Sequence, residues 1–371
     1  MQLSSEPLLS GAKRPIVSRR PLNIALVAPL VAPIGDPEPY GNHALLIDLA
    51  TGLSQRGHRV RVYAAEGSRV PGVDLLQFTV DQGARGAPAG FERLFRRLRS
   101  DAPDVVSQHA FDAEAIELAE RFPVLHTLHM PPIVPAVVRS CAHTAAPLAA
   151  VSEFSAQQWR AAGAQRVQAI RDGVPDFTPF ARHVEPVALI AGRICREKGT
   201  AAGIRAALAA GLRVHLIGGV YDAGYFQREV APLLGERVRM RACLPRRELW
   251  NVMAHCAVCL LPIEWDEPFG LVAAEAQVAG CPVVGYARGA LPEIVEQDIS
   301  GILVPSGDER GLIAAVGRAA ALDRNRVRAS ARARLLIEPM LDRYEAELRS
   351  IAQRHRAHAL LEVLRTPTAA A

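Results

Sequence analysis

The feature that most constrains this chain is an alternation of apolar strands and amphipathic helices that runs twice, once on each side of a proline-rich break. The break, Arg171–Pro186, holds three prolines and shows no regular periodicity. Before it, the apolar runs LNIALVAPL (22–30) and HRVRVYAA (58–65) flank a helical stretch, NHALLIDLATGLSQRG. After it, VALIAGR (187–193), GTAAGIRAALAAG and LRVHLIGG repeat the same order. Repeated βαβ units of this kind predict parallel, doubly wound sheets.

The two series predict an α/β protein with two Rossmann-like domains that face a central cleft. We expect a disordered lead-in over residues 1–20, a first domain over 21–180 and a second over 181–340. From about residue 309 the chain reads as helix to near residue 365. The segment 341–371 is expected to be a helix that packs back on the first domain, followed by a loose tail. Ligands of such folds bind beyond the carboxyl ends of the strands, so the cleft is the expected site.

Length and composition set the class of protein. A chain of 371 residues is more than one core usually supports. The formal charge of +5 mildly favours anionic partners, but no basic run is interleaved with aromatics, so nucleic acid is not expected. No stretch reaches the ~20 apolar residues of a membrane span. Six cysteines without disulfide or zinc spacing, including the CxxC of Cys256 and Cys259, favour buried thiols and a cytoplasmic protein.

The common nucleotide-binding fingerprints are absent from the sequence. No GxGxxG follows the first strand, so an NAD- or FAD-binding site lacks its phosphate turn, and no GxxxxGK[ST] occurs. The function therefore has to come from other residues.

Two cations follow the first strand of the second series, in GRICREKG (192–199). Arg193 offers a planar fork and Lys198 a compact point charge, a pair that suits a diphosphate. Lysine is rare in this chain, because only Lys13 and Lys198 among 43 basic residues are lysine. The alternative is a pair of solvated loop cations.

Two glutamates eight residues apart flank a Pro-Phe-Gly corner in EPFGLVAAE (267–275). Glu267 and Glu275 can accept hydrogen bonds from the hydroxyls of a sugar or a ribose. The alternative is a glutamate that stabilises a helix dipole and a second that is merely solvated. A third acid, Glu293, follows a glycine-bearing turn in RGALPEIV and is a weak signal by itself.

The residues around this corner predict a helix and a buried strand. Pro268 suits a first helical position, Gly280 the residue just past the helix end, and Pro282–Tyr286 an interior strand. Free backbone N–H groups where the helix opens, at Phe269–Leu271, would favour a phosphate or a hydroxyl.

GRICREKG together with the later EPFGLVAAEA resembles the retaining GT-B glycosyltransferases of family 4, also called group 1. The likeness covers nearly the whole chain and is densest over 187–305. It implies that the first domain takes the acceptor and the second takes a nucleotide-sugar donor.

The resemblance also implies the catalytic roles. Arg193 and Lys198 would hold the donor diphosphate, and Glu267 would touch the donor sugar. Glu275 would bind the ribose hydroxyls. His129, in HTLHMPP, would lie beside the transferred sugar.

The remaining donor contacts implied by the resemblance are backbone groups. The N–H groups of Phe269, Gly270 and Leu271 would contact sugar and phosphate. Gly41 would belong to a loop that approaches the phosphates.

The chain departs from the family pattern at three places. Tyr40 precedes Gly41 where the family often has a second glycine, and Asp172 stands where it often has asparagine. RGALPE replaces a commoner Gly-Gly-x-Pro-Glu. The first change could alter how the loop meets the phosphates.

The reaction implied is transfer of a sugar, with retention, from a nucleotide diphosphate to an acceptor hydroxyl. A UDP-linked donor is favoured over a GDP-linked one, and the acceptor stays open between a saccharide, a lipid-linked sugar and a natural product. No metal is expected, because two cations and a helix N-terminus can stabilise the departing diphosphate and no DxD-like acid pair stands at a strand end. The alternatives are a nucleotide-sugar epimerase and a non-catalytic nucleotide-sugar-binding subunit.

Two further features of the sequence each have two possible interpretations. The basic stripe FERLFRRLRS (91–100) is expected to be an amphipathic helix with Leu94, Phe95 and Leu98 inward, and weak contact with anionic lipid is the alternative. His109, at another strand end, has either a structural role or an acceptor contact.

Overall fold

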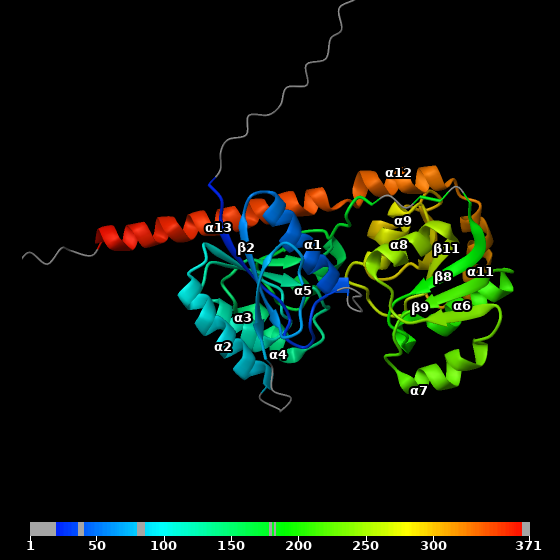
Figure 1. Ribbon diagram of the computed structural model, residues 1–371, viewed down its shortest axis with the longest axis horizontal. Helices are drawn as coiled ribbons and strands as arrows, with labels where there is room; N and C mark the ends of the chain where they lie inside the picture. The colour runs from blue at the N-terminus through cyan, green and yellow to red at the C-terminus, as the bar shows by residue number, and fades with distance from the viewer. Residues whose placement is uncertain (1–19, 36–40, 80–85, 178–179, 182, 366–371) are drawn as a thin grey trace, which may run out of the picture.

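The computed structural model describes residues 20–35, 41–79, 86–177, 180–181 and 183–365. It contains two α/β domains, each built on a parallel sheet with helices around it, and the last helix lies along the first domain (Figure 1). The expected fold class is therefore confirmed. The lead-in up to residue 19, Tyr40 and the tail from residue 366 lie outside the described residues.

In the described part of the first domain, seven strands pair in the order β3-β2-β1-β4-β5-β6-β7, all parallel. The strands are β1 (Asn23–Val27), β2 (Arg59–Ala65), β3 (Asp74–Phe78), β4 (Val105–Gln108), β5 (Val124–Leu128), β6 (Leu148–Ala150) and β7 (Val167–Ala169). The helices are α1 (Gly41–Gln55), α2 (Gly86–Asp101), α3 (Ala113–Ala119), α4 (Pro135–His143) and α5 (Glu153–Ala161).

The described residues of the second domain form six parallel strands in the order β10-β9-β8-β11-β12-β13. The strands are β8 (Glu185–Ala191), β9 (Arg213–Ile217), β10 (Val238–Arg241), β11 (Cys256–Leu261), β12 (Val283–Tyr286) and β13 (Gly301–Val304). The helices are α6 (Thr200–Ala209), α7 (Ala223–Tyr225), α8 (Arg246–His255), α9 (Leu271–Val278), α10 (Leu291–Ile294), α11 (Glu309–Ala320) and α12 (Arg324–Arg334).

Both faces of the second sheet are covered, which explains its nearly continuous apolar strands. All six residues of β11 are buried. Cys259 and Leu261 pack into the core on one side of the sheet, and Val258 and Leu260 into the core on the other. Burial on two faces is typical of parallel sheets with helical crossovers.

Two details at the C-terminal side of the chain differ from the sequence expectations. Helix α9 begins at Leu271 with Gly270 as its N-cap, so Pro268 lies before the helix instead of at its first position. The helical region after residue 309 is divided into α11, α12 and α13 (Ile337–Arg365). The side chain of Asp323 accepts from the backbone N–H of Asn325 and so caps the start of α12.

The chain passes between the domains twice, at residues 172–176 (the first crossing) and at residues 335–337 (the second crossing). These two crossings lie against each other. Val174 donates its N–H to the Leu335 carbonyl and accepts from the N–H of Ile337, each at 2.9 Å. A Cβ on Gly173 would stand 2.6 Å from the Leu336 carbonyl oxygen, so this close approach requires glycine.

Helix α13 belongs to the first domain by its contacts. Ile337, Met340, Tyr344 and Leu348 are buried in one core with α1 and β1. The boundary expected at residue 340 therefore falls inside this helix.

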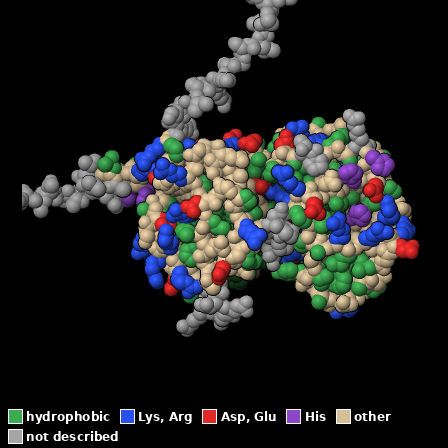
Figure 2. All heavy atoms as spheres, in the orientation of Figure 1, with side chains coloured by type: hydrophobic (Ala, Val, Ile, Leu, Met, Phe, Trp, Pro, Cys, Tyr) green, Lys and Arg blue, Asp and Glu red, His purple; other side chains and the backbone are tan. Residues whose placement is uncertain are grey.

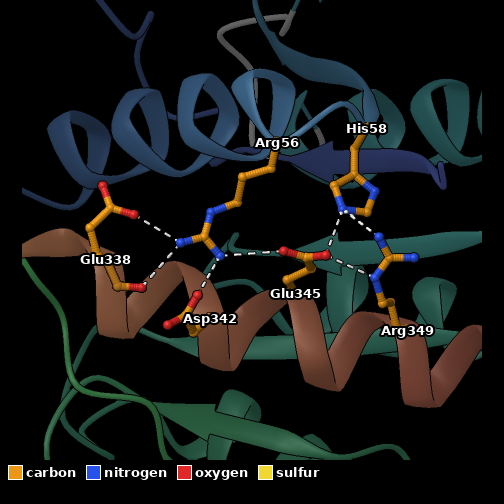
Figure 3. Close-up of polar contacts among 6 residues, drawn as sticks. All are labelled: Arg56, His58, Glu338, Asp342, Glu345 and Arg349. Carbon is orange, nitrogen blue, oxygen red and sulfur yellow. Dashed lines mark hydrogen bonds and ion pairs between the residues drawn. The ribbon is translucent and has the colours of Figure 1, made fainter. Parts of the chain in front are cut away.

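Ion pairs fix α13 against the end of α1 (Figure 3). Arg56 bonds Glu338 at 2.9 Å and Asp342 at 2.8 Å. Glu345 lies between Arg56 and Arg349 and also reaches His58. These contacts tie the end of the chain to the first domain.

The basic stripe forms part of α2, and its apolar face is turned inward as expected. Phe91, Leu94, Phe95 and Leu98 are buried in a core with β1 and β2. Within the described residues, no helix is long and apolar enough to cross a membrane. On the face in Figure 2, basic and acidic side chains are interspersed over both lobes.

Candidate active site

The largest concentration of predicted site residues lines a cavity of about 170 Å³ at the carboxyl ends of β8 and β9. Gly41 comes from the first domain, and Arg193, Leu271 and Glu275 come from the second. A wider cavity of about 520 Å³ adjoins it, because Arg193 and Tyr221 line both. The cleft expected between the two strand edges is therefore present at this point.

Arg193 lies two residues after the end of β8 and is held from two sides. Its Nη2 bonds Glu197 Oε1 at 2.9 Å, and its guanidinium carbon lies 4.8 Å from the ring centre of Tyr221. An arginine fixed in this way presents a planar fork to the cavity without having to order a free side chain.

Lys198 ends a 3₁₀ turn, Arg196–Lys198, and the backbone then turns through Gly199 at φ 65°. A Cβ at Gly199 would stand 1.9 Å from the Pro262 carbonyl oxygen, so no other residue fits there. Lys198 Nζ bonds Glu267 Oε2 at 2.5 Å, and Trp265 Nε1 donates to the same oxygen at 2.6 Å. Two of the predicted catalytic residues are therefore each other's counter-charge.

The Pro-Phe-Gly corner brings the domains together. Gly270 has φ 99°, and Phe269 is buried beneath the corner. Across the domain boundary, Ser152 Oγ donates to the Pro268 carbonyl at 2.6 Å, and Gly41 lies against the side chain of Leu271.

The backbone N–H groups of Phe269, Gly270 and Leu271 have no hydrogen-bond partner among the described residues. They lie at the N-terminus of α9, where the helix dipole favours an anion or a hydroxyl oxygen.

Glu275 is buried inside α9 and is not merely solvated. Its Oε1 accepts from Arg246 Nε at 2.6 Å, and Arg246 Nη1 bonds Asp48 Oδ2 at 2.6 Å. Neither Arg246 nor Asp48 was predicted from the sequence. The available signal was Asp48 itself, an acid within the apolar run ALLIDLATGL, just as Glu275 stands among alanines.

His129 follows β5 and is buried in the first domain. Its Nε2 lies 2.9 Å from Nδ1 of His109, and His109 Nε2 lies 2.8 Å from Ser107 Oγ. Among the described residues, no hydrogen bond or ion pair joins His129 to the second domain. The structure thus groups His129 with His109, apart from the cations and glutamates of the other domain.

Burial, with a smaller contribution from His43, lowers the pKa of His129 to about 3. Burial, together with His129, also lowers the pKa of His109 well below its ordinary value. Both imidazoles are therefore neutral at physiological pH, and one of them must donate to the other. A neutral His129 can exchange hydrogen bonds with a sugar hydroxyl but carries no positive charge.

The described residues include no group of three or more His, Cys, Asp or Glu side chains arranged to hold a metal ion. Arg193, Glu275 and the first residue of α9, Leu271, line the cavity. Lys198 and Glu267 line neither of the two cavities and pair with each other. Such a set suits a ligand that has a diphosphate at one end of a polyhydroxyl group.

Two family models match consecutive parts of the chain. Glycosyl transferases group 1 matches residues 177–335, and Glycosyltransferase Family 4 matches residues 43–176. The division between them falls at the crossing between the domains.

Two of the curated relatives share one name. The D-inositol 3-phosphate glycosyltransferase of Mycolicibacterium smegmatis is 26% identical, with 78% of this chain and 81% of that protein covered. The protein of the same name from Xylanimonas cellulosilytica is 34% identical, with 40% of this chain and 37% of that protein covered. The chain thus spans little more than a third of this second relative.

Among solved structures, Anabaena HepE in complex with UDP and glucose superposes with a TM-score of 0.73 at 20% identity. The match covers 89% of this chain and all of that one. At this identity the likeness establishes the fold alone.

Proposed function

We propose that this chain, which belongs to the group 1 glycosyltransferases of the GT-B fold, transfers a sugar from a UDP-linked donor to an acceptor hydroxyl. The transfer would retain the anomeric configuration of the sugar. The observation that carries the proposal is that Arg193, Glu275 and the first residue of α9, Leu271, line one cavity. Lys198 pairs with Glu267, and its neighbour Glu197 lines the adjoining cavity.

In this proposal each part of the donor has a binding partner in the site. The ribose hydroxyls would bond Glu275, the diphosphate would lie between Arg193, Lys198 and the α9 N-terminus, and the sugar would reach Glu267. UDP is preferred to GDP because a protein of the same fold binds UDP and glucose in its crystal structure.

The residues then have separate tasks in the reaction. The C–O bond between sugar and diphosphate breaks, and Arg193 and Lys198 stabilise the charge that grows on the departing phosphate. The acceptor hydroxyl attacks from the same face, and its proton passes to that phosphate. Neutral His129 orients the transferred sugar from the first domain, which raises the rate by positioning. No step uses a metal.

An inositol phosphate is the first acceptor to test. The support is the name shared by the relatives from Mycolicibacterium smegmatis and Xylanimonas cellulosilytica. We also place the reaction in the cytoplasm, because all six cysteines are free thiols, as a reducing compartment favours.

The test is an incubation with a panel of UDP- and GDP-linked hexoses, each with and without an inositol phosphate. Release of UDP that depends on acceptor, with a product whose anomeric configuration matches the donor by proton NMR, is the expected result. Turnover of donor alone to an epimer would support an epimerase instead. Tight nucleotide binding without turnover of any donor would support a binding subunit.

A further inference from the structure

Asp48, Arg246 and Glu275 form a continuous chain of ion pairs from the first domain to the nucleotide cavity. Asp48 lies on α1, Arg246 is the first residue of α8, and Glu275 lies inside α9. The two contacts are both 2.6 Å and use different nitrogens of one guanidinium. Arg246 and Glu275 line the cavity, whereas Asp48 does not.

All three side chains of this ion-paired series are largely buried. The side chains of Asp48, Arg246 and Glu275 are 12%, 16% and 4% exposed. Burial lowers the pKa of Arg246, but the carboxylates of Glu275 and Asp48 outweigh it and raise that pKa overall. Burial raises the pKa of Asp48 to about 6, so Asp48 carries its charge at neutral pH and loses it in mild acid. Ion pairs with so little exposure are screened by solvent and salt much less than surface pairs.

Arg246 is also fixed from the side of the interdomain crossing. Its guanidinium carbon lies 4.9 Å from the ring centre of Trp250, and Trp250 stacks on Phe177 with centroids 3.9 Å apart. A planar guanidinium can stack on an aromatic ring and bond two carboxylates at once, which a lysine ammonium cannot do.

We propose that Asp48 and Arg246 are positioning residues for the donor, through which the first domain holds Glu275 in the orientation that binds the ribose hydroxyls. This inference rests on the proposed function. Arg246 Nε bonds Oε1 of Glu275, so Oε2 of this carboxylate would be the atom that accepts from a ribose in the cavity. Asp48 contacts no donor itself, and its effect reaches the ribose through two hydrogen bonds.

The proposal has a consequence that a purely structural ion pair would not have. Loss of Asp48 should weaken the part of the affinity that comes from the ribose hydroxyls and leave the part that comes from base and diphosphate. A general loosening of the fold would weaken both parts together.

The experiment compares UDP with 2′,3′-dideoxy-UDP by isothermal titration calorimetry on the full chain. We expect the wild type to prefer UDP by at least about tenfold, since removing hydroxyls leaves a buried acceptor unpaired. In Asp48→Asn and Arg246→Lys the preference should fall to about threefold or less, with dideoxy-UDP affinity within about twofold of wild type.

Asp342→Asn is the matched control. This substitution also replaces a carboxylate of the first domain that bonds an arginine. The arginine here is Arg56, which lies away from the cavity. This variant should keep the full preference for UDP.

Two results would overturn the proposal, and they have different consequences for the proposed function. If the wild type prefers UDP and Asp48→Asn keeps that preference, the positioning role fails while the donor site stands. If the wild type binds neither nucleotide, the proposed function fails and the positioning role with it.

Discussion

Lys198 and Glu267 form an ion pair of 2.5 Å between the turn that follows β8 and the segment that precedes α9. Both side chains are mostly buried, at 20% and 15% exposure. Binding of a diphosphate would give Lys198 a second anion and release Glu267 toward the sugar. The pair therefore holds both groups in place before the donor arrives.

Replacing Lys198 should lower turnover strongly while the protein still folds. If the lysine stabilises charge on the departing phosphate, Lys198→Ala should lower kcat by roughly 10²–10³. Lys198→Arg should recover part of that loss, because it keeps the charge without the compact geometry. The free energy of unfolding should fall by about 1–3 kcal/mol, because the mostly buried Glu267 loses its counter-charge and keeps Trp265 as a donor. Steady-state kinetics and urea denaturation measure the two effects.

Arg205→Ala is the control for this prediction. Arg205 is half-exposed on α6 and pairs with Glu309, so its loss removes an ion pair of the same domain away from the cleft. Wild-type turnover in Lys198→Ala would contradict a catalytic role for the cleft.

Activity should not require a divalent metal. Arg193, Lys198 and the N-terminus of α9 supply the positive charge that a metal ion would otherwise provide. The measurement is transfer of sugar after dialysis against excess EDTA, which we expect to leave the rate unchanged. Loss of activity that only Mg²⁺ or Mn²⁺ restores would refute the prediction.

His129→Ala should lower kcat by at least about tenfold and leave the affinity for UDP within about twofold, because in the proposed reaction the imidazole orients the sugar and not the nucleotide. The pKa of about 3 adds a second expectation. A base with this pKa is already neutral at pH 5, so His129 should contribute no fall in kcat between pH 8 and pH 5. The readout is a pH–rate profile beside calorimetry with UDP.

His143→Ala, an exposed histidine at the end of α4, should behave as wild type in both assays. An equal loss of UDP affinity in His129→Ala would place this residue in the nucleotide site or in the core.

The sequence predicted the parts of the site that lie close together along the chain. Arg193 and Lys198 stand in one turn, and Glu267 to Glu275 span one corner and one helix, so local spacing identified them. Asp48 and Arg246 are 198 residues apart. Their contact depends on how two domains meet, which no local pattern encodes.

Local sequence also predicted the secondary structure only in part. Strands at sheet edges, β3, β7 and β10, were not predicted, because they are short and partly exposed and their pairing depends on a neighbour. The Ala/Arg-rich composition after residue 309 continues across the breaks between α11, α12 and α13. The break before α13 follows from the second crossing, where Leu336 lies against Gly173.

Asp172 is a buried acid in the first crossing, at a position where the family often has asparagine. Its Oδ1 has no hydrogen-bond partner among the described residues. Burial raises its pKa well above the ordinary value of 3.8. The native protein therefore keeps this carboxyl protonated at a pH where the unfolded chain has lost the proton.

Asp172→Asn should stabilise the protein by an amount that grows with pH. Above about pH 4 the unfolded wild type releases a proton that the folded state retains, so wild-type stability falls by about 1.4 kcal/mol per pH unit until the folded pKa is reached. An amide has no proton to release, and the variant lacks this loss. Urea denaturation of both proteins at pH 4, 5 and 6 should show the difference in unfolding free energy rising with pH. Asp176→Asn, in the same crossing but partly exposed and paired with Arg332, should show no such rise. A difference for Asp172→Asn that stays constant with pH would mean that the carboxyl is already ionised in the folded state.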